Sequence, residues 1–216
     1  MRRALPVVAL VAALFVPGAE AHFGTGKLGY RSTIRKVTPP VRGIHLKVLY
    51  GDDQILLDNR TGKTIVIEGY SGEPYLRFSP RGIAVNVNSP AGFLNRDRYA
   101  RASVPKTATA NAKPKWETLA GGELWSWHDH RIHYMSPIAP LQVRDAPRKP
   151  HHIFNWKVPA TANGRPFIIS GTLDYKPPPK QTSSFPTGLV IALGALIGAG
   201  MVGLFALRRV LIRSLE

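Results

Sequence analysis

The chain contains no cysteine, and acidic residues are scarce in it. Its 216 residues include 29 Lys and Arg but only 13 Asp and Glu, which gives a formal net charge of +16. Without cysteine the chain cannot form disulfides, thiolate zinc sites, iron–sulfur clusters or a copper centre with a cysteine ligand. Any metal ion must therefore be bound by nitrogen and oxygen atoms, or weakly by a methionine thioether.

The sequence also lacks the motifs of common hydrolases and nucleotide-binding enzymes. It has no Gly-x-Ser-x-Gly, no His-Glu-x-x-His and no phosphate-binding loop. Asp129 and Glu73 could each act with a catalytic base in principle, but nothing in the sequence places them together. We therefore leave enzymatic activity open and expect binding rather than catalysis.

The first residues are typical of a secretory signal peptide. Arg2 and Arg3 precede an apolar run over 4–17, and the small residues of Ala19-Glu20-Ala21 form a cleavage site. We predict a signal peptide over 1–21, so that the mature chain begins at His22. The alternative is an uncleaved N-terminal anchor.

The last residues predict a single membrane anchor. The uncharged run 188–207 would form a helix about 30 Å long, the thickness of a bilayer core. Arginines in the following tail, 208–216, place that tail in the cytoplasm. A Pro-rich linker over 176–187 precedes the run, so the domain at 22–175 is expected on the extracytoplasmic side of the cell membrane. A buried core helix is the alternative interpretation of the run.

The positive charge of the exported part is expected to attract anionic surfaces. Lipid head groups, cell-envelope polymers and an acidic partner protein are all candidates, whereas no nucleic acid is expected in that compartment. Because the basic residues are scattered along the chain and do not form one groove, we favour a merely soluble basic surface.

The exported domain is predicted to consist of short strands separated by turn residues. Pro80-Arg81-Gly82 indicates a hairpin between 75–79 and 83–87, and Asn163-Gly164-Arg165-Pro166 predicts the turn between the last two strands. The pattern predicts an all-β, antiparallel β-sandwich of roughly seven to nine strands, either cupredoxin-like or immunoglobulin-like. The region 89–115 is expected to be a long excursion with one helical turn near residues 91–95. The expected strands are 44–50, 54–58, 64–70, 75–79, 83–87, 124–135, 153–158 and 167–175.

Three of the seven histidines fall close together in the sequence. His128 and His130 would share one face of a strand, with Cα atoms roughly 6.5–7 Å apart, so two imidazoles can close on one ion. His133 would fall on the opposite face with Asp129, unless a bulge intervenes. We take His133, Asp129 and Met135 as candidates for additional ligands.

An N-terminal His22 would strengthen such a site. Its free α-amine and its imidazole form a chelate, and His128 and His130 supply further nitrogen atoms. Nitrogen donors in a T-shaped or tetragonal arrangement favour Cu(II), so the predicted metal ligands are His22, His128 and His130, and the predicted cofactor is copper.

Trp127-His128-Asp129-His130, with Met135, resembles a segment of the N-terminal cupredoxin domain of the B subunit of particulate methane monooxygenase. In that family the mature chain also begins with histidine, so the resemblance implies a copper site at His22, His128 and His130. The resemblance covers only these positions and the general layout, and it brings no methane oxidation with it. In four segments, namely 30–32, 69–75, Asn95-Arg96-Asp97 with Tyr99, and 127–135, the whole chain also resembles a group of poorly characterised, membrane-anchored exported proteins of actinobacteria. That resemblance implies no activity.

The sequence patterns and the resemblance leave three functions open. The first is a membrane-anchored extracytoplasmic copper-binding protein for copper handling or delivery, with a copper-handling or membrane-complex partner protein. The second is a metal-free interaction module of the cell envelope. The third is a copper-dependent oxidative enzyme.

Overall fold

The computed structural model describes residues 29–178, together with Leu196, Gly200, Gly203, Leu204 and Arg208. The chain divides into two compact units, Met1–Pro178 and Pro179–Glu216. The predicted signal peptide, His22 and most of the predicted anchor lie outside the described residues. Those five residues of the second unit are helical, and no described helix has the length and apolar character that crossing a membrane requires.

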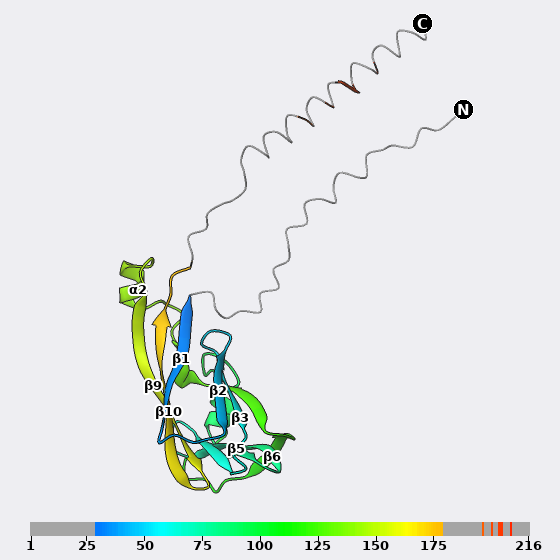
Figure 1. Cartoon of the computed structure of the whole chain (residues 1–216), viewed down its shortest axis with the longest axis vertical. Coiled ribbons are helices and arrows are strands. Elements are labelled where there is room, and N and C mark those ends of the chain that lie inside the picture. Colours follow the sequence, from blue (N-terminus) through cyan, green and yellow to red (C-terminus); the bar gives the residue numbers. More distant parts are fainter. Residues whose placement is uncertain (1–28, 179–195, 197–199, 201–202, 205–207, 209–216) are drawn as a thin grey trace, which may run out of the picture. The chain divides into compact units, whose positions relative to one another are not determined.

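The regular secondary structure in the described part of the first unit consists mostly of antiparallel β-strands (Figure 1). One sheet has seven strands in the order β1-β10-β9-β4-β5-β6-β7, and the other has three in the order β2-β3-β8. Its helices are α1 (Ala91–Leu94), α2 (Leu141–Asp145) and a 3₁₀ helix (His130–Ile132). The strands are β1 (Tyr30–Thr38), β2 (Ile44–Leu49), β3 (Gln54–Asn59), β4 (Ile65–Glu68), β5 (Pro74–Ser79), β6 (Gly82–Asn86), β7 (Trp116–Ala120), β8 (Leu124–His128), β9 (His151–Ala162) and β10 (Arg165–Tyr175).

The predicted antiparallel all-β class is confirmed, and the arrangement is consistent with a sandwich. The expected number of strands was too low, because the described residues form ten strands. The two that the sequence did not predict, β1 and β7, lie at the two edges of the larger sheet. An edge strand buries little side-chain surface, and the three central residues of β7 are all exposed. Such strands lack the clear alternation of apolar and polar residues that identifies a strand in the sequence.

Turn chemistry predicted two hairpins correctly. In the β5–β6 hairpin Ser79 pairs with Gly82, as the intervening Pro-Arg dipeptide indicates. In the β9–β10 hairpin Ala162 pairs with Arg165 across the two-residue loop Asn163-Gly164. Both loop residues have positive φ angles, 47° and 79°, which a type I′ turn requires and which asparagine and glycine tolerate best.

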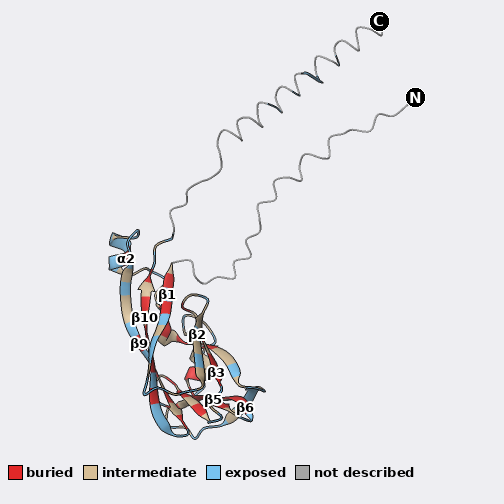
Figure 2. Cartoon of the chain, viewed as in Figure 1, coloured by how far each residue is buried: buried red, intermediate tan, exposed pale blue. Residues whose placement is uncertain are grey.

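The two sheets share one hydrophobic core (Figure 2). Ile55 and Leu57 alternate with half-buried residues along β3 and are fully buried. Phe78 of the larger sheet meets Trp127 of β8, with the ring centroids 6.0 Å apart. Fully burying a side chain of this size stabilises the fold by about 1.5–3 kcal/mol. This contact fixes the end of β8, where the histidines follow.

We predict that Gly171→Ala destabilises the fold. A Cβ atom at Gly171 would lie 2.2 Å from the Trp156 ring and 2.2 Å from the carbonyl oxygen of Thr33. Because neither the buried ring nor the paired strand can yield freely, the free energy of unfolding should fall by about 1–3 kcal/mol. Denaturant titration measures this change. Gly121→Ala is the matched control, since nothing lies within 4 Å of its added Cβ, and an equal loss there would contradict the explanation.

Candidate metal centre

The strand that carries the histidines is shorter than the sequence suggested. We expected it to run over 124–135, but β8 ends at His128. The side chain of Asp129 then accepts a hydrogen bond from the backbone N–H of Arg131 and so caps the 3₁₀ helix His130–Ile132. In a 3₁₀ helix the side chains at positions i and i+3 lie over one another, and His133, the C-cap residue, is three positions after His130.

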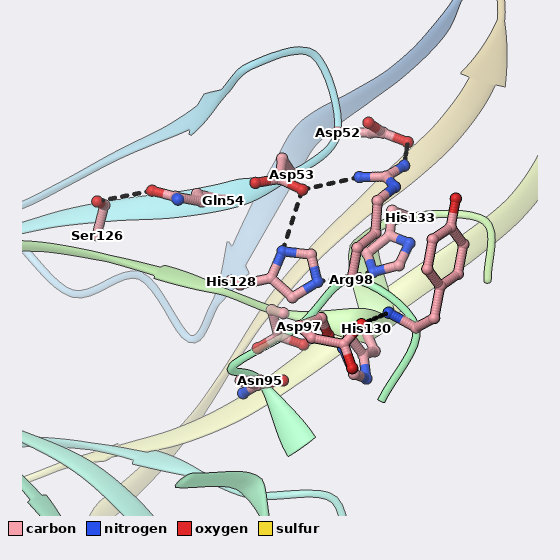
Figure 3. A network of polar contacts seen from close by, with 12 residues as sticks. Asp52, Asp53, Gln54, Asn95, Asp97, Arg98, Ser126, His128, His130 and His133 are labelled. Carbon is pink, nitrogen blue, oxygen red and sulfur yellow. Dashed lines mark hydrogen bonds and ion pairs between the residues drawn. The ribbon is translucent and has the colours of Figure 1, made fainter. Parts of the chain in front are cut away.

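This turn brings His133 to the same place as His128 and His130. The expectation that His133 points away from the pair is therefore wrong, because it assumed a continuous strand. One ligand atom from each of the three imidazoles lies within 4.8 Å of the others (Figure 3). The Nε2 atoms of His128 and His133 are only 3.0 Å apart. This three-histidine cluster, His128, His130 and His133, can hold a metal ion.

Each imidazole of the cluster is held through its other nitrogen by an oxygen atom. His128 Nδ1 lies 3.1 Å from a carboxylate oxygen of Asp53. His130 Nε2 lies 2.8 Å from the carbonyl oxygen of Asp97, and His133 Nδ1 lies 3.2 Å from that of Tyr134. Oxygen partners of this kind fix the tautomer and orientation of metal-ligating histidines. They leave His128 Nε2, His130 Nδ1 and His133 Nε2 as the candidate ligand atoms.

Two of the imidazoles are kept in the neutral form that a metal ion requires. Burial, followed by the positive charge of Arg98, lowers the pKa of His133 to about 4. Burial also lowers the pKa of His130, although its contact with the Asp97 carbonyl opposes the shift. At neutral pH both rings therefore present a lone pair.

A buried ion-pair network supports His128. Arg98 donates from Nη1 to Asp53 and from Nη2 to Asp52, at 2.8 Å each (Figure 3). Burial alone would raise the pKa of Asp53, but the hydrogen bonds and charges of His128 and Arg98 hold that pKa below its usual value. Burial does raise the pKa of Asp52, despite the charge of Arg98. The carboxylate of Asp53 is thus kept ionised beside His128.

The segment 95–101 closes over the cluster and was not recognised from the sequence as part of a site. The carboxylate of Asp97 accepts hydrogen bonds from the backbone N–H groups of Tyr99 and Arg101, which fixes the loop. The same residue offers its carbonyl to His130. No motif in the sequence marks this segment as part of a site.

Tyr70 joins this loop to the cluster. Its hydroxyl accepts a hydrogen bond of 3.0 Å from the backbone N–H of His130 and donates one to the side-chain oxygen of Asn95. Its ring also stacks on the His130 ring, with centroids 5.9 Å apart. His130 is therefore held at its backbone, at its ring face and at one ring nitrogen.

Asp129, a predicted candidate ligand, instead supports the turn. It is fully buried, and its two oxygens accept hydrogen bonds from Trp127 Nε1 and from the guanidinium of Arg131. Burial alone would raise its pKa, but the hydrogen bonds and charge of Arg131, with the Trp127 N–H, hold the pKa below its usual value. Arg131 also donates to the carbonyl of Glu68. Asp129 does not belong to the convergent group of ligand atoms.

The remaining predicted site residues lie elsewhere. His22 lies outside the described residues, and Met135 is 37% exposed two positions beyond His133, so both stay predictions as ligands. His151 bonds the carbonyl of Ala146, and His152 pairs with Asp174 at 2.9 Å.

We predict that Asp129→Asn destabilises the fold by about 3 kcal/mol. The substitution leaves the guanidinium of Arg131 largely buried without its counter-charge, and breaking a buried pair in this way is costly. Thermal or denaturant unfolding measures the loss. Asp174→Asn, which breaks the exposed pair with His152, is the control and should cost less than about 1 kcal/mol.

We also predict a pH dependence from His133. The unfolded chain takes up a proton on this residue near pH 6.5, whereas the folded protein does so only near pH 4. Between these values the unfolded state binds more protons, so the free energy of unfolding of the metal-free protein falls as pH falls through this window. The slope should be smaller in His133→Gln than in the unsubstituted chain. Equal slopes over pH 4–6.5 would contradict this prediction.

Comparison with known proteins found no match for the chain. No protein-family description, no curated protein and no solved structure matches it. Any function therefore has to be inferred from the geometry of the three-histidine cluster and its surroundings.

Proposed function

We propose that this chain is an extracytoplasmic, membrane-anchored protein that binds copper and serves copper handling or delivery. The observation that carries the proposal is the convergence of three imidazoles whose second nitrogens are all bonded to oxygen atoms. The signal peptide and the anchor come from the sequence patterns at 1–21 and 188–207. The cupredoxin-like form of the sandwich belongs to the same proposal.

The hydrogen-bond partners of His128 and His133 favour a cation between them. With both Nδ1 atoms donating to oxygen, both Nε2 atoms carry lone pairs, and these face each other at 3.0 Å. Such a contact is repulsive unless a proton or a metal ion lies between the two nitrogens. The lowered pKa of His133 opposes the proton on that ring, and a metal ion satisfies both atoms.

The spacing of these nitrogens is compatible with copper. Two nitrogens about 2.0–2.1 Å from one ion and 3.0 Å apart subtend about 91–97° at the ion. This is close to the angle between neighbouring ligands in a tetragonal site, which Cu(II) prefers. Cu(II) also binds nitrogen donors more tightly than the other divalent ions of its row. His128, His130 and His133 would hold the ion.

His22 would complete the site in this proposal. The resemblance to the cupredoxin domain of the methane monooxygenase subunit implies that its α-amine and imidazole join His128 and His130. The structure adds His133 to that set, so three imidazoles are available even before the N-terminus contributes. We therefore expect His22 to raise the affinity rather than to create the site.

A metal-free interaction module is the second candidate. The 3.0 Å contact between His128 and His133 is also the length of a hydrogen bond, which one doubly protonated imidazole could donate to the other. In that case the cluster is a polar support for the loop 95–101, and added metal has no specific effect.

We predict that the processed full-length chain binds one Cu(II) with imidazole ligands. Copper titration should produce an electron paramagnetic resonance spectrum of a tetragonal nitrogen site, and His133→Ala and His130→Ala should each weaken binding. Asp53→Asn should lower the affinity about 10–100-fold, because the partner that orients His128 is changed.

His152→Ala is the matched control for this titration. Like His128, His152 is bonded to a carboxylate, but His152 is exposed and lies outside the cluster. Its variant should bind copper as the unsubstituted chain does. If His130→Ala and His133→Ala also bind copper unchanged, the metal proposal fails and the metal-free module remains.

The role of His22 is tested separately. Mass spectrometry of the exported protein should show a mature terminus at His22. One additional residue before His22 should then reduce the copper affinity and alter the resonance spectrum, since the α-amine moves away from the imidazole. A mature terminus at any other residue would contradict this part of the proposal.

A further inference from the structure

One end of the described domain gathers α2, the turn after it and both ends of the domain's chain. Tyr175, near the end of β10, pairs with His151 and donates a hydrogen bond of 2.9 Å from its hydroxyl to the carbonyl of Pro147. Lys176 donates its backbone N–H to the carbonyl of Gly29. We call residues 134–151 with Lys176 the α2 end; it lies next to Pro178, the last residue described before the linker (Figure 1).

The α2 end exposes large apolar side chains. Ile138 is 65% exposed and Leu141 is 62% exposed, whereas Val143 on the same short helix is buried in the core. The helix is docked by Gln142, which donates to the carbonyl of His152. Leu141 is thus held outward by a fixed element rather than by a free tail. Single exposed apolar side chains are common on protein surfaces, so the charge near these two and their place in the fold carry the argument for a contact site.

Positive charge accompanies these apolar side chains in the α2 end. Four exposed cations lie in the α2 end, and Asp145 is the one acidic residue there. None of the four makes an ion pair within the part of the chain that the structure describes, although other exposed arginines of the domain do. The four are Arg144, Arg148, Lys149 and Lys176. Apolar side chains flanked by unpaired cations match the surface of a membrane that contains anionic lipids.

We propose that the α2 end rests on the anionic lipid surface of the membrane that holds the anchor. This inference rests on the proposed C-terminal anchor at 188–207. The nine residues 179–187 span at most about 30 Å, so the tether keeps Pro178 near the bilayer. The α2 end is the part of the domain nearest this tether, and its effective concentration at the lipid surface is therefore high. A contact site for a second copy or for an acidic protein could lie anywhere on the domain, whereas a site for lipid has to lie near the tether.

This orientation sets the direction of β10 relative to the membrane. The β10 strand is 11 residues long, about 35 Å, and its opposite end carries the Asn163-Gly164 turn. With the α2 end on the lipid, that turn points away from the membrane. The three-histidine cluster lies beside β8, and Ile132 in the turn between His130 and His133 is buried in the shared core.

The absence of cysteine allows a direct test. The full-length variant Ile138→Cys carries an environment-sensitive fluorophore and is reconstituted into vesicles of phosphatidylcholine and phosphatidylglycerol. We expect a blue shift and strong quenching by phosphatidylcholine brominated near the head group. The matched variant is Leu124→Cys, because Leu124 is 52% exposed and pairs with Asp58 in the smaller sheet, away from the α2 end. Its label should be neither shifted nor quenched.

Further experiments distinguish contact with lipid from failure of the anchor and from contact with a second copy. Charge reversal by Arg144→Glu with Arg148→Glu should weaken the quenching at position 138, as should vesicles of phosphatidylcholine alone. Flotation of the vesicles after an alkaline wash tests the anchor itself. A chain that fails to float overturns the anchor and this inference together. A chain that floats while position 138 responds no more than position 124 overturns this inference alone. Quenching lost on dilution of protein in lipid would assign the surface to a second copy and also overturn it.

Discussion

One carboxylate, that of Asp53, connects the parts of the candidate metal centre. It lies directly before β3, and it meets both His128 at the end of β8 and Arg98 in the loop that covers the site. Three segments far apart in the sequence are thereby fixed to one another. A neutral residue in this position would leave Arg98 without half of its counter-charge and His128 without a partner for its Nδ1 atom. The orientation of the first imidazole therefore depends on an acid that is not a ligand.

The other two imidazoles are placed by backbone atoms. The carbonyl groups of Asp97 and Tyr134 accept from His130 and His133, so these contacts depend on how the chain turns rather than on side-chain identity. The turn between the two histidines is stabilised by the buried pair of Asp129 and Arg131. The site thus depends on the Arg98–Asp53 pair and on the Asp129–Arg131 pair, and neither contributes a ligand atom.

The sequence predicted those features that depend on neighbouring residues. The Asn-Gly and Pro-Arg-Gly turns identified two hairpins, and His-x-His identified two of the three clustered imidazoles. His133 was misplaced because its position depends on a 3₁₀ turn, and that turn exists because Asp129 caps it and Arg131 reaches the carbonyl of Glu68. Such contacts depend on residues that are far apart in the sequence, and local sequence patterns carry no information about them.

The same limit explains why Asp53 and Asp97 were not recognised as parts of the site. Asp53 comes close to His128 only because β3 pairs with β8 in the register that sets Gln54 opposite His128. Asp97 does so only because its loop folds back over the cluster. The edge strands β1 and β7 were missed for a different reason: strands that bury little surface carry a weak hydrophobic pattern.

The wide separation in sequence of the partners around the cluster sets an order of events. His128, His130 and His133 are near neighbours, but the oxygen atoms that orient two of them come from Asp53 and Asp97. A chain that has not yet folded has the histidines without these partners. A preorganised site then exists only after β3, β8 and the loop have assembled, so metal loading of this site would follow folding. Once bound, the ion would stabilise the folded protein against unfolding in proportion to the logarithm of free metal over its dissociation constant.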